Sequence, residues 1–298
     1  MAVDASDNIL VGGHSAGSMF AGNAGAEDLI AMKLGTDGAV QWQQQYGSTG
    51  SDKTGNCDVD AATGDLYLTG QAWASILGVG YGGLADIFLL KLLGASGVNS
   101  WIVSAGTAQH EFGVAIKVVA DGVLLGGFTD GDFLGETNQG GYDAVMQKWS
   151  KTGNLMWQKQ FGTSVYDAVD AFAVDESGSI IVGGNTMGSM EGTCGARGSM
   201  DWFLMGLDYN GQEQWKMQIG SNVSDDLRTI ALDAAGNLYV SGFTAGVLGA
   251  NSSGSTDVVV MKAGVRSCRR LLGSRGCRLQ EPHVIRVFQG CLDLTSVT

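Results

Sequence analysis

A period of 57 residues constrains this chain more than any other feature of its sequence. Short apolar segments that end in glycine, such as ILVGG and IIVGG, recur with their final glycines spaced 57, 57, 57 and 58 residues apart. These glycines are Gly13, Gly70, Gly127, Gly184 and Gly242. Self-similarity at a period of this length is typical of an architecture that repeats one supersecondary unit.

Two further series of markers keep the same period. An aspartate opens apolar segments such as DLIAMK and DIFLLK, and a tryptophan is followed five residues later by a glycine and five residues after that by an acid. The first series is Asp28, Asp86, Asp143, Asp201 and Asp257, and the second is Trp42, Trp101, Trp157 and Trp215, with Gly47, Gly106, Gly162 and Gly220 and then Asp52, Glu111, Asp167 and Asp225. The chain therefore holds four full repeats and part of a fifth.

Each repeat predicts about four β-strands. Turn sequences such as DESGS and YNG separate short apolar segments, and no window keeps apolar residues at helical spacing. Two strands of each repeat are apolar on both faces and need layers above and below them. We therefore predict an all-β fold, a β-propeller of four-stranded antiparallel blades. With four full repeats and a partial fifth, we expect an incomplete propeller, as a fragment would give.

The last 35 residues differ from the rest of the chain. The repeats occupy 1–263, whereas 264–298 holds six of the eight arginines, three of the five cysteines and the only proline. We predict a basic tail outside the repeat, poorly ordered. Two readings stay open: sequence unrelated to the repeat, or an appendage that binds an acidic partner.

The segments AVDESGSIIVGGNT, DWFLMGLDYNGQEQW and IGSNVSDDLRTIALD resemble the SBBP family of β-propeller repeats. The resemblance covers residues 2–263, with departures at Gly206 and at Ala105 and Gly106. It implies a propeller on a secreted or cell-surface protein, with no general catalytic residues to carry over.

The negative charge of the chain argues against one class of partner, nucleic acids. The formal net charge is −13, and because the tail is basic, residues 1–263 carry −17. A body this acidic repels phosphate backbones, so we expect no nucleic-acid partner. No apolar run approaches the length of a transmembrane helix, and we predict no transmembrane segment.

Two short motifs match catalytic or cofactor signatures. Residues 13–17, GHSAG, fit the G-x-S-x-G nucleophile elbow of hydrolases, and residues 78–83, GVGYGG, fit the G-x-G-x-x-G dinucleotide signature. Both signatures require a helix after a strand, which the repeat does not predict. We therefore predict no catalytic and no cofactor-binding residues.

The recurring aspartates have two readings. Each carboxylate can accept backbone N–H bonds and fix the preceding loop, or the set can form oxygen sites for Ca²⁺, an ion that takes 6–8 oxygen ligands. No D-x-D-x-D-G spacing supports the calcium reading, so we favour the structural one and predict no metal site. The four tryptophans are expected to anchor blade packing.

The most variable loop of each repeat predicts where binding would occur. These loops lie between the Gly70-type glycine and the Asp86-type aspartate, and each carries apolar residues at its tip. The tips that could form a partner-binding rim are Phe20, Leu77, Phe133, Met190 and Leu248. The alternative, which we favour, is that these side chains pack under the rim as additional core.

These observations predict a non-catalytic propeller scaffold for interaction with a protein or a glycan. The alternative is a quinoprotein-like cofactor-binding enzyme, because WSKTGNLMW resembles the D-x-x-T-G-x-x-x-W repeat of that class. Such an enzyme needs polar residues that break the repeat symmetry, and the sequence markers are repeat-wide.

Overall fold

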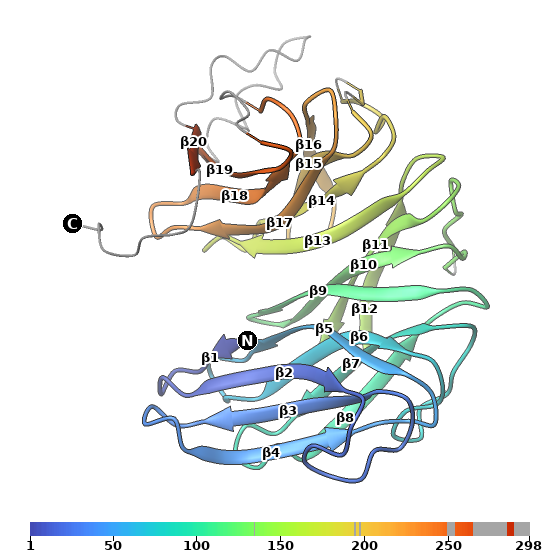
Figure 1. Cartoon of the computed structure of the whole chain (residues 1–298), viewed down its shortest axis with the longest axis vertical. Helices are drawn as coiled ribbons and strands as arrows, with labels where there is room; N and C mark the ends of the chain where they lie inside the picture. The colour runs from blue at the N-terminus through green and yellow to red at the C-terminus, as the bar shows by residue number, and fades with distance from the viewer. Residues whose placement is uncertain (134, 194, 197, 249–253, 265–284, 289–298) are drawn as a thin grey trace. The chain divides into compact units, whose positions relative to one another are not determined.

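The computed structural model describes residues 1–133, 135–193, 195–196, 198–248, 254–264 and 285–288. Within these ranges every regular element is a β-strand, and the strands form five antiparallel four-stranded sheets (Figure 1). In each sheet, spatial neighbours are also neighbours along the chain, which is the meander topology of a propeller blade. The predicted all-β fold of repeated four-stranded blades is confirmed.

The chain divides into two compact units, Met1–Phe172 and Ala173–Thr298. The first unit contains three sheets. They are β1 (Ala2–Val3), β2 (Ile9–Ser15), β3 (Asp28–Leu34) and β4 (Val40–Tyr46); β5 (Asp52–Val59), β6 (Leu66–Ala72), β7 (Asp86–Leu92) and β8 (Asn99–Ala105); and β9 (Glu111–Val119), β10 (Gly122–Thr129), β11 (Asp143–Ser150) and β12 (Leu155–Phe161).

The second unit contains the rest of the fourth sheet, whose first strand begins in the first unit, and the whole fifth sheet. The fourth sheet is β13 (Asp167–Val174), β14 (Ile180–Thr186), β15 (Asp201–Leu207) and β16 (Glu213–Ile219). The fifth sheet is β17 (Asp225–Leu232), β18 (Asn237–Thr244), β19 (Asp257–Gly264) and β20 (Ile285–Phe288).

The sequence markers occupy equivalent places in the sheets. Every third strand begins at one of the predicted aspartates, and each marker tryptophan stands opposite the same position of that strand, one residue before a register shift. The pairs are Trp42 with Lys33, Trp101 with Lys91, Trp157 with Lys148, and Trp215 with Gly206. The five repeats are therefore structurally equivalent, as predicted.

The departure at Gly206 has a local cause. In other repeats this position is a lysine whose ammonium pairs with a carboxylate, as Lys33 does with Asp4 at 2.8 Å. A Cβ at Gly206 would lie 2.1 Å from Nε1 of Trp215. The indole thus occupies the space that a side chain at position 206 would need.

Sheets of the first unit pack face to face through their first strands. Strand β5 lies against β2 and β3, and β9 lies against β5 and β6. Between the first two sheets, Leu68 and Phe88 are fully buried. The indole N–H of Trp42 donates to the carbonyl of Gly94 in the next sheet at 3.0 Å, so this tryptophan has the predicted packing role.

The two ends of the repeat array differ from the sheets between them. Strand β1 has only two residues. In the fifth sheet, β20 pairs with β19 at the position where other sheets carry the tryptophan strand, although β20 lies in the predicted tail. The other predicted tail residues, 265–284 and 289–298, lie outside the described residues, and incomplete closure stays a prediction.

Within the described ranges the structure contains no helix with the length and apolar content that a membrane crossing needs.

Candidate ligand-binding surface

The recurring aspartates fix the loop that precedes them. Asp28, Asp86 and Asp143 are buried, and Oδ2 of each accepts the backbone N–H of the residue four positions earlier. The donors are Ala24 (3.0 Å), Gly82 (2.7 Å) and Gln139 (2.8 Å), respectively. This is the structural reading that the sequence analysis favoured over calcium binding.

A glutamine that the sequence analysis missed completes this loop anchor. In the first repeat, Nε2 of Gln45 donates to Asp28 Oδ2 at 2.9 Å and to the carbonyl of Gly17, while its Oε1 accepts the N–H groups of Met19 and Phe20. Gln160 and Gln218 bond the equivalent aspartate and loop in the third and fourth repeats, and in the second repeat Ser104 donates to Asp86 instead. The signal was a polar residue three positions after each marker tryptophan.

The acid after each tryptophan strand caps a second turn in the same way. Asp52 accepts the N–H of Ser48 at 2.5 Å, and Glu111 accepts that of Thr107 at 2.8 Å. Both acids are fully buried. Burial raises the pKa of both carboxyl groups, and these hydrogen bonds offset only part of that shift.

The glycine that follows each marker tryptophan leaves room for the carboxylate of the aspartate that opens the third strand. A Cβ on Gly47 would lie 1.9 Å from Oδ1 of Asp28, and one on Gly106 would lie 2.3 Å from Oδ1 of Asp86. These two oxygens are buried and have no hydrogen-bond partner among the described residues. No group of three or more metal-ligating side chains occurs in the described part of the chain. Calcium binding by these aspartates stays an untested alternative.

The predicted rim residues separate into buried and accessible ones. Phe133, Met190 and Leu248 are buried, and the N–H groups of Phe133 and Met190 donate to Gln160 and Gln218. Phe20 is half-buried and Leu77 is 39% exposed. The structure therefore gives three of the five side chains a packing role, which favours the additional-core reading at those positions.

The two catalytic-looking motifs lie in strand ends and loops. Ser15 is the last residue of β2, and its hydroxyl accepts the N–H of Gly17 at 3.1 Å. Residues 78–83 belong to the loop between β6 and β7. Neither segment continues into a helix, which is the element that each signature requires.

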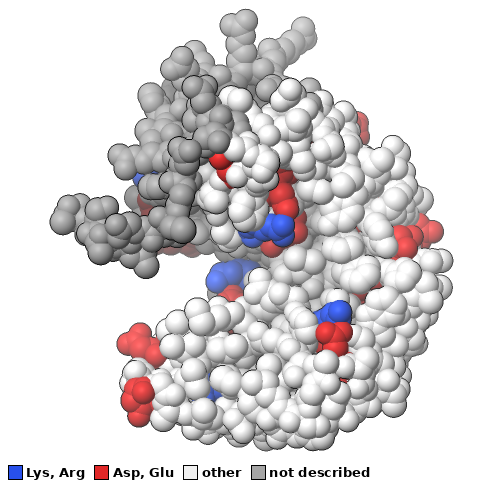
Figure 2. All heavy atoms as spheres, in the orientation of Figure 1, with Lys and Arg blue, Asp and Glu red and all other residues white. Residues whose placement is uncertain are grey.

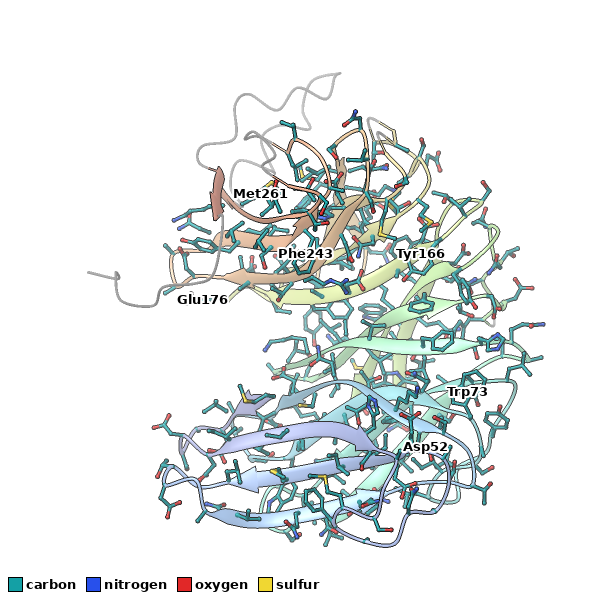
Figure 3. All side chains as sticks on the ribbon, viewed as in Figure 1. Asp52, Trp73, Tyr166, Glu176, Phe243 and Met261 are labelled. Carbon is teal, nitrogen blue, oxygen red and sulfur yellow. The ribbon has the colours of Figure 1, made fainter. Side chains whose placement is uncertain are left out.

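A different set of side chains forms a continuous surface at the same ends of the strands. Six rings of the first unit, which we call the aromatic strip, each contact the next with centroid separations of 4.8–6.3 Å. They are Trp73, His110, Phe112, Phe128, Tyr142 and Tyr166. Figure 3 labels the two ends of the strip, Trp73 and Tyr166, with ring side chains lying between them.

The aromatic strip is accessible. Trp73 is 40% exposed and the other five residues are partly buried. Phe112 and Phe128 are directly opposite each other on β9 and β10, and their rings stack at 4.8 Å. Partly exposed rings suit a contact surface, since aromatic side chains bring large apolar area and well-defined geometry.

The position of Phe128 carries a phenylalanine again in the fifth repeat, as Phe243, and other residues in the remaining repeats. The register places Phe128 where the first, second and fourth repeats have His14, Gln71 and Asn185. Tyr142, which precedes Asp143, corresponds to Glu27 in the first repeat and Ala85 in the second. The second and fourth repeats thus form a sheet without a ring at the Phe128 position, so blade packing does not require the Phe128 ring.

Charged groups flank the aromatic strip on two sides. The backbone N–H of His110 donates to Asp130 at 2.7 Å, and Nδ1 of its ring lies 3.2 Å from the same carboxylate. Burial, together with the charge of Asp130, raises the pKa of Tyr142. The carboxylate of Asp130 therefore interacts with two rings of the strip, those of His110 and Tyr142.

A polar cluster adjoins the other end of the strip. The carboxylate of Glu27 pairs with Lys53 at 2.9 Å and accepts the hydroxyl of Ser51 at 2.7 Å. The N–H of Trp73 donates to the carbonyl of Ser51, which connects this cluster to the rings. Figure 2 shows the charged side chains of the visible face as small separate groups, with no continuous basic stretch among the coloured residues of that face.

Comparisons with known proteins leave the family open. No known protein family matches the sequence, and no curated protein resembles it closely enough to count as a relative. Among solved structures, the chain is similar to XC5397 from Xanthomonas campestris, described as a gluconolactonase important in glucose secondary metabolic pathways. The identity is 13%, the match covers 76% of this chain and 69% of that one, and the TM-score is 0.39. A likeness of this degree carries no argument about the activity of this chain.

Proposed function

We propose that this chain is a non-catalytic scaffold of β-propeller blades that binds a partner through the aromatic strip. The observation that carries the proposal is that the residues which recur along the repeats have structural roles, whereas rings of the strip lie at positions that the repeat does not fix. Residues that recur along the repeats, such as Asp28 and Gly47, hold turns and loops together. The Phe128 and Tyr142 rings stand where the second repeat has Gln71 and Ala85, and they are partly exposed.

Features of the surface support a binding role. An exposed apolar area that the fold does not need marks an interaction site in a folded protein. Aromatic residues are also the residue types most enriched among those that dominate binding energy. The resemblance to SBBP repeats, and the secreted or surface location that it implies, stay predictions, as does the quinoprotein alternative.

The test compares the wild-type chain with a Tyr142→Ser, Tyr166→Ser double variant on arrays of peptides and glycans. We expect the wild type to bind members of at least one array and the double variant to lose most of that signal. A Tyr209→Ser variant is the control, because Tyr209 is an exposed tyrosine of the second unit, outside the strip. Binding that survives the double substitution, or a wild type that binds neither array, would contradict the proposal.

A further inference from the structure

The fifth repeat contains its own example of a cation on a ring at the strip position. Phe243 is the residue equivalent to Phe128, since each stands one residue before the threonine that pairs with the third-strand aspartate. The guanidinium of Arg228 lies over the Phe243 ring, 5.7 Å from its centroid. The carboxylate of Asp226, which is opposite Phe243 in the sheet, pairs with that guanidinium.

The third repeat has the rings and a carboxylate, Asp130, which pairs with the imidazole of His110 and not with a guanidinium. Among the described residues, no lysine or arginine lies over Trp73, Phe112, Phe128 or Tyr142. Two rings, Phe112 and Phe128, are paired where the fifth repeat has one ring and one acid. The nearby acid in the third repeat is Asp130, whose charge acts on Tyr142.

The charge of the chain favours the same kind of ligand. Residues 1–263 carry −17, and the cation in the polar cluster beside Trp73, Lys53, is already held by Glu27. An incoming cation would be attracted by this net charge. An anionic ligand would be repelled by it.

We infer that the aromatic strip binds an arginine side chain in a basic segment of a partner protein, an inference that rests on the proposed function. The planar guanidinium stacks on ring faces and pairs with a carboxylate, whereas a lysine ammonium offers a strongly hydrated point charge. Arg228 makes both contacts in the fifth repeat. The strip offers ring faces from four residue types and the carboxylate of Asp130 for the same two contacts.

The experiment measures fluorescence anisotropy of a labelled eight-residue peptide that alternates arginine and glycine. Two matched peptides replace each arginine by lysine or by citrulline, which keeps the planar shape and removes the charge. The full chain is titrated as wild type and as the variants Phe128→Leu, Tyr142→Leu and Asp130→Asn, with Tyr209→Leu as control. Asparagine at position 130 can still accept the N–H of His110, so this variant removes the charge and otherwise changes only the group beside Nδ1 of His110.

We expect the arginine peptide to bind about three- to thirtyfold more weakly to each strip variant than to the wild type, the range of one cation–π contact. The lysine peptide should bind more weakly than the arginine peptide, and the citrulline peptide should not bind measurably. Equal binding of the citrulline peptide, an arginine affinity that no strip variant changes, or no binding by the wild type would overturn the inference.

A wild-type measurement guards against variants that fail to fold. In proton NMR spectra of the unlabelled arginine peptide, the δ-CH₂ protons should shift upfield on binding because they enter the shielding region above a ring. The absence of this shift in a bound peptide would contradict stacking. If the aromatic strip binds a glycan or an apolar peptide while the arginine peptide fails, the inference falls and the proposed function stands.

Discussion

The carboxylate of Asp28 occupies the volume that a side chain at Gly47 would need. A Cβ built on Gly47 would lie 1.9 Å from Oδ1 and 2.3 Å from Cγ of that aspartate. Asp28 cannot easily move away, because Ala24 and Gln45 both donate hydrogen bonds to its Oδ2. The glycine of the repeat is therefore a steric requirement of the buried acid.

Replacing Gly47 by alanine should destabilise the chain by about 2–3 kcal/mol, the cost of forcing extra volume into a packed site. The matched control is Gly22→Ala in the same repeat, where an added Cβ meets nothing within 4 Å, and this change should stay within about 0.5 kcal/mol. Urea unfolding of the two variants measures both values. Equal stability of the two variants would show that Asp28 adapts at little cost.

The loop anchor around Gln45 leads to a second prediction. Gln45→Ala removes the acceptor of the Met19 and Phe20 N–H groups and a donor to Asp28, so it should cost about 2 kcal/mol. Gln41→Ala, at an exposed residue of the same strand whose amide bonds Asn8, is the control and should cost well under about 1 kcal/mol. Hydrogen exchange at the Phe20 amide should accelerate in the first variant alone.

The buried acids predict opposite pH dependences at two places. Burial raises the pKa of Asp52, so its carboxyl favours the folded state at low pH and that contribution is lost as pH rises through the folded pKa. Burial also opposes ionisation of Asp4, but hydrogen bonds from Lys33 and Asn8 outweigh it and lower the pKa. The contribution of Asp4 is therefore present above the unfolded pKa and is lost as pH falls.

The corresponding asparagine variants check these signs. Asp52→Asn should stabilise the chain relative to wild type at pH 7, and the gain should shrink as pH falls from the raised folded pKa to about 4, the ordinary pKa of a carboxyl group. Asp4→Asn should destabilise at pH 7, with the loss shrinking as pH falls below about 4 toward the lowered folded pKa. Chemical unfolding at several pH values provides the measurement, and identical pH slopes for the two variants would contradict the account.

The repeat explains how much of this structure could be predicted. Period-locked markers such as Asp86 and Trp101 report backbone and packing requirements that every blade shares, so they predicted the strand starts and the equivalent tryptophans. The glutamine anchor was readable in principle, but Ser104 interrupts it in the second repeat. Strand β20 was not predicted, because its sequence lacks the tryptophan marker.

The aromatic strip could not be found by the same reasoning. Phe112 and Tyr142 stand where the second repeat has Lys53 and Ala85, so no period marks them, and Phe112 and Phe128 are 16 positions apart along the chain. Only the register of β9 with β10 brings them together. The repeat pattern instead indicated the loop tips as a partner-binding rim. In the structure, Phe133 and Met190 of these tips are buried.

The most direct test of the central claim is the free energy of unfolding of a Phe128→Gln variant. Glutamine is the residue that the second repeat carries at this position, as Gln71, so a blade accommodates it. If Phe128 serves binding, the variant should lose no more than about 1.5 kcal/mol, the value of an aromatic pair contact, while it loses the ligand of the strip. A loss of about 3–5 kcal/mol, as for a phenylalanine removed from a core, would show that the rings belong to the core and would contradict the account.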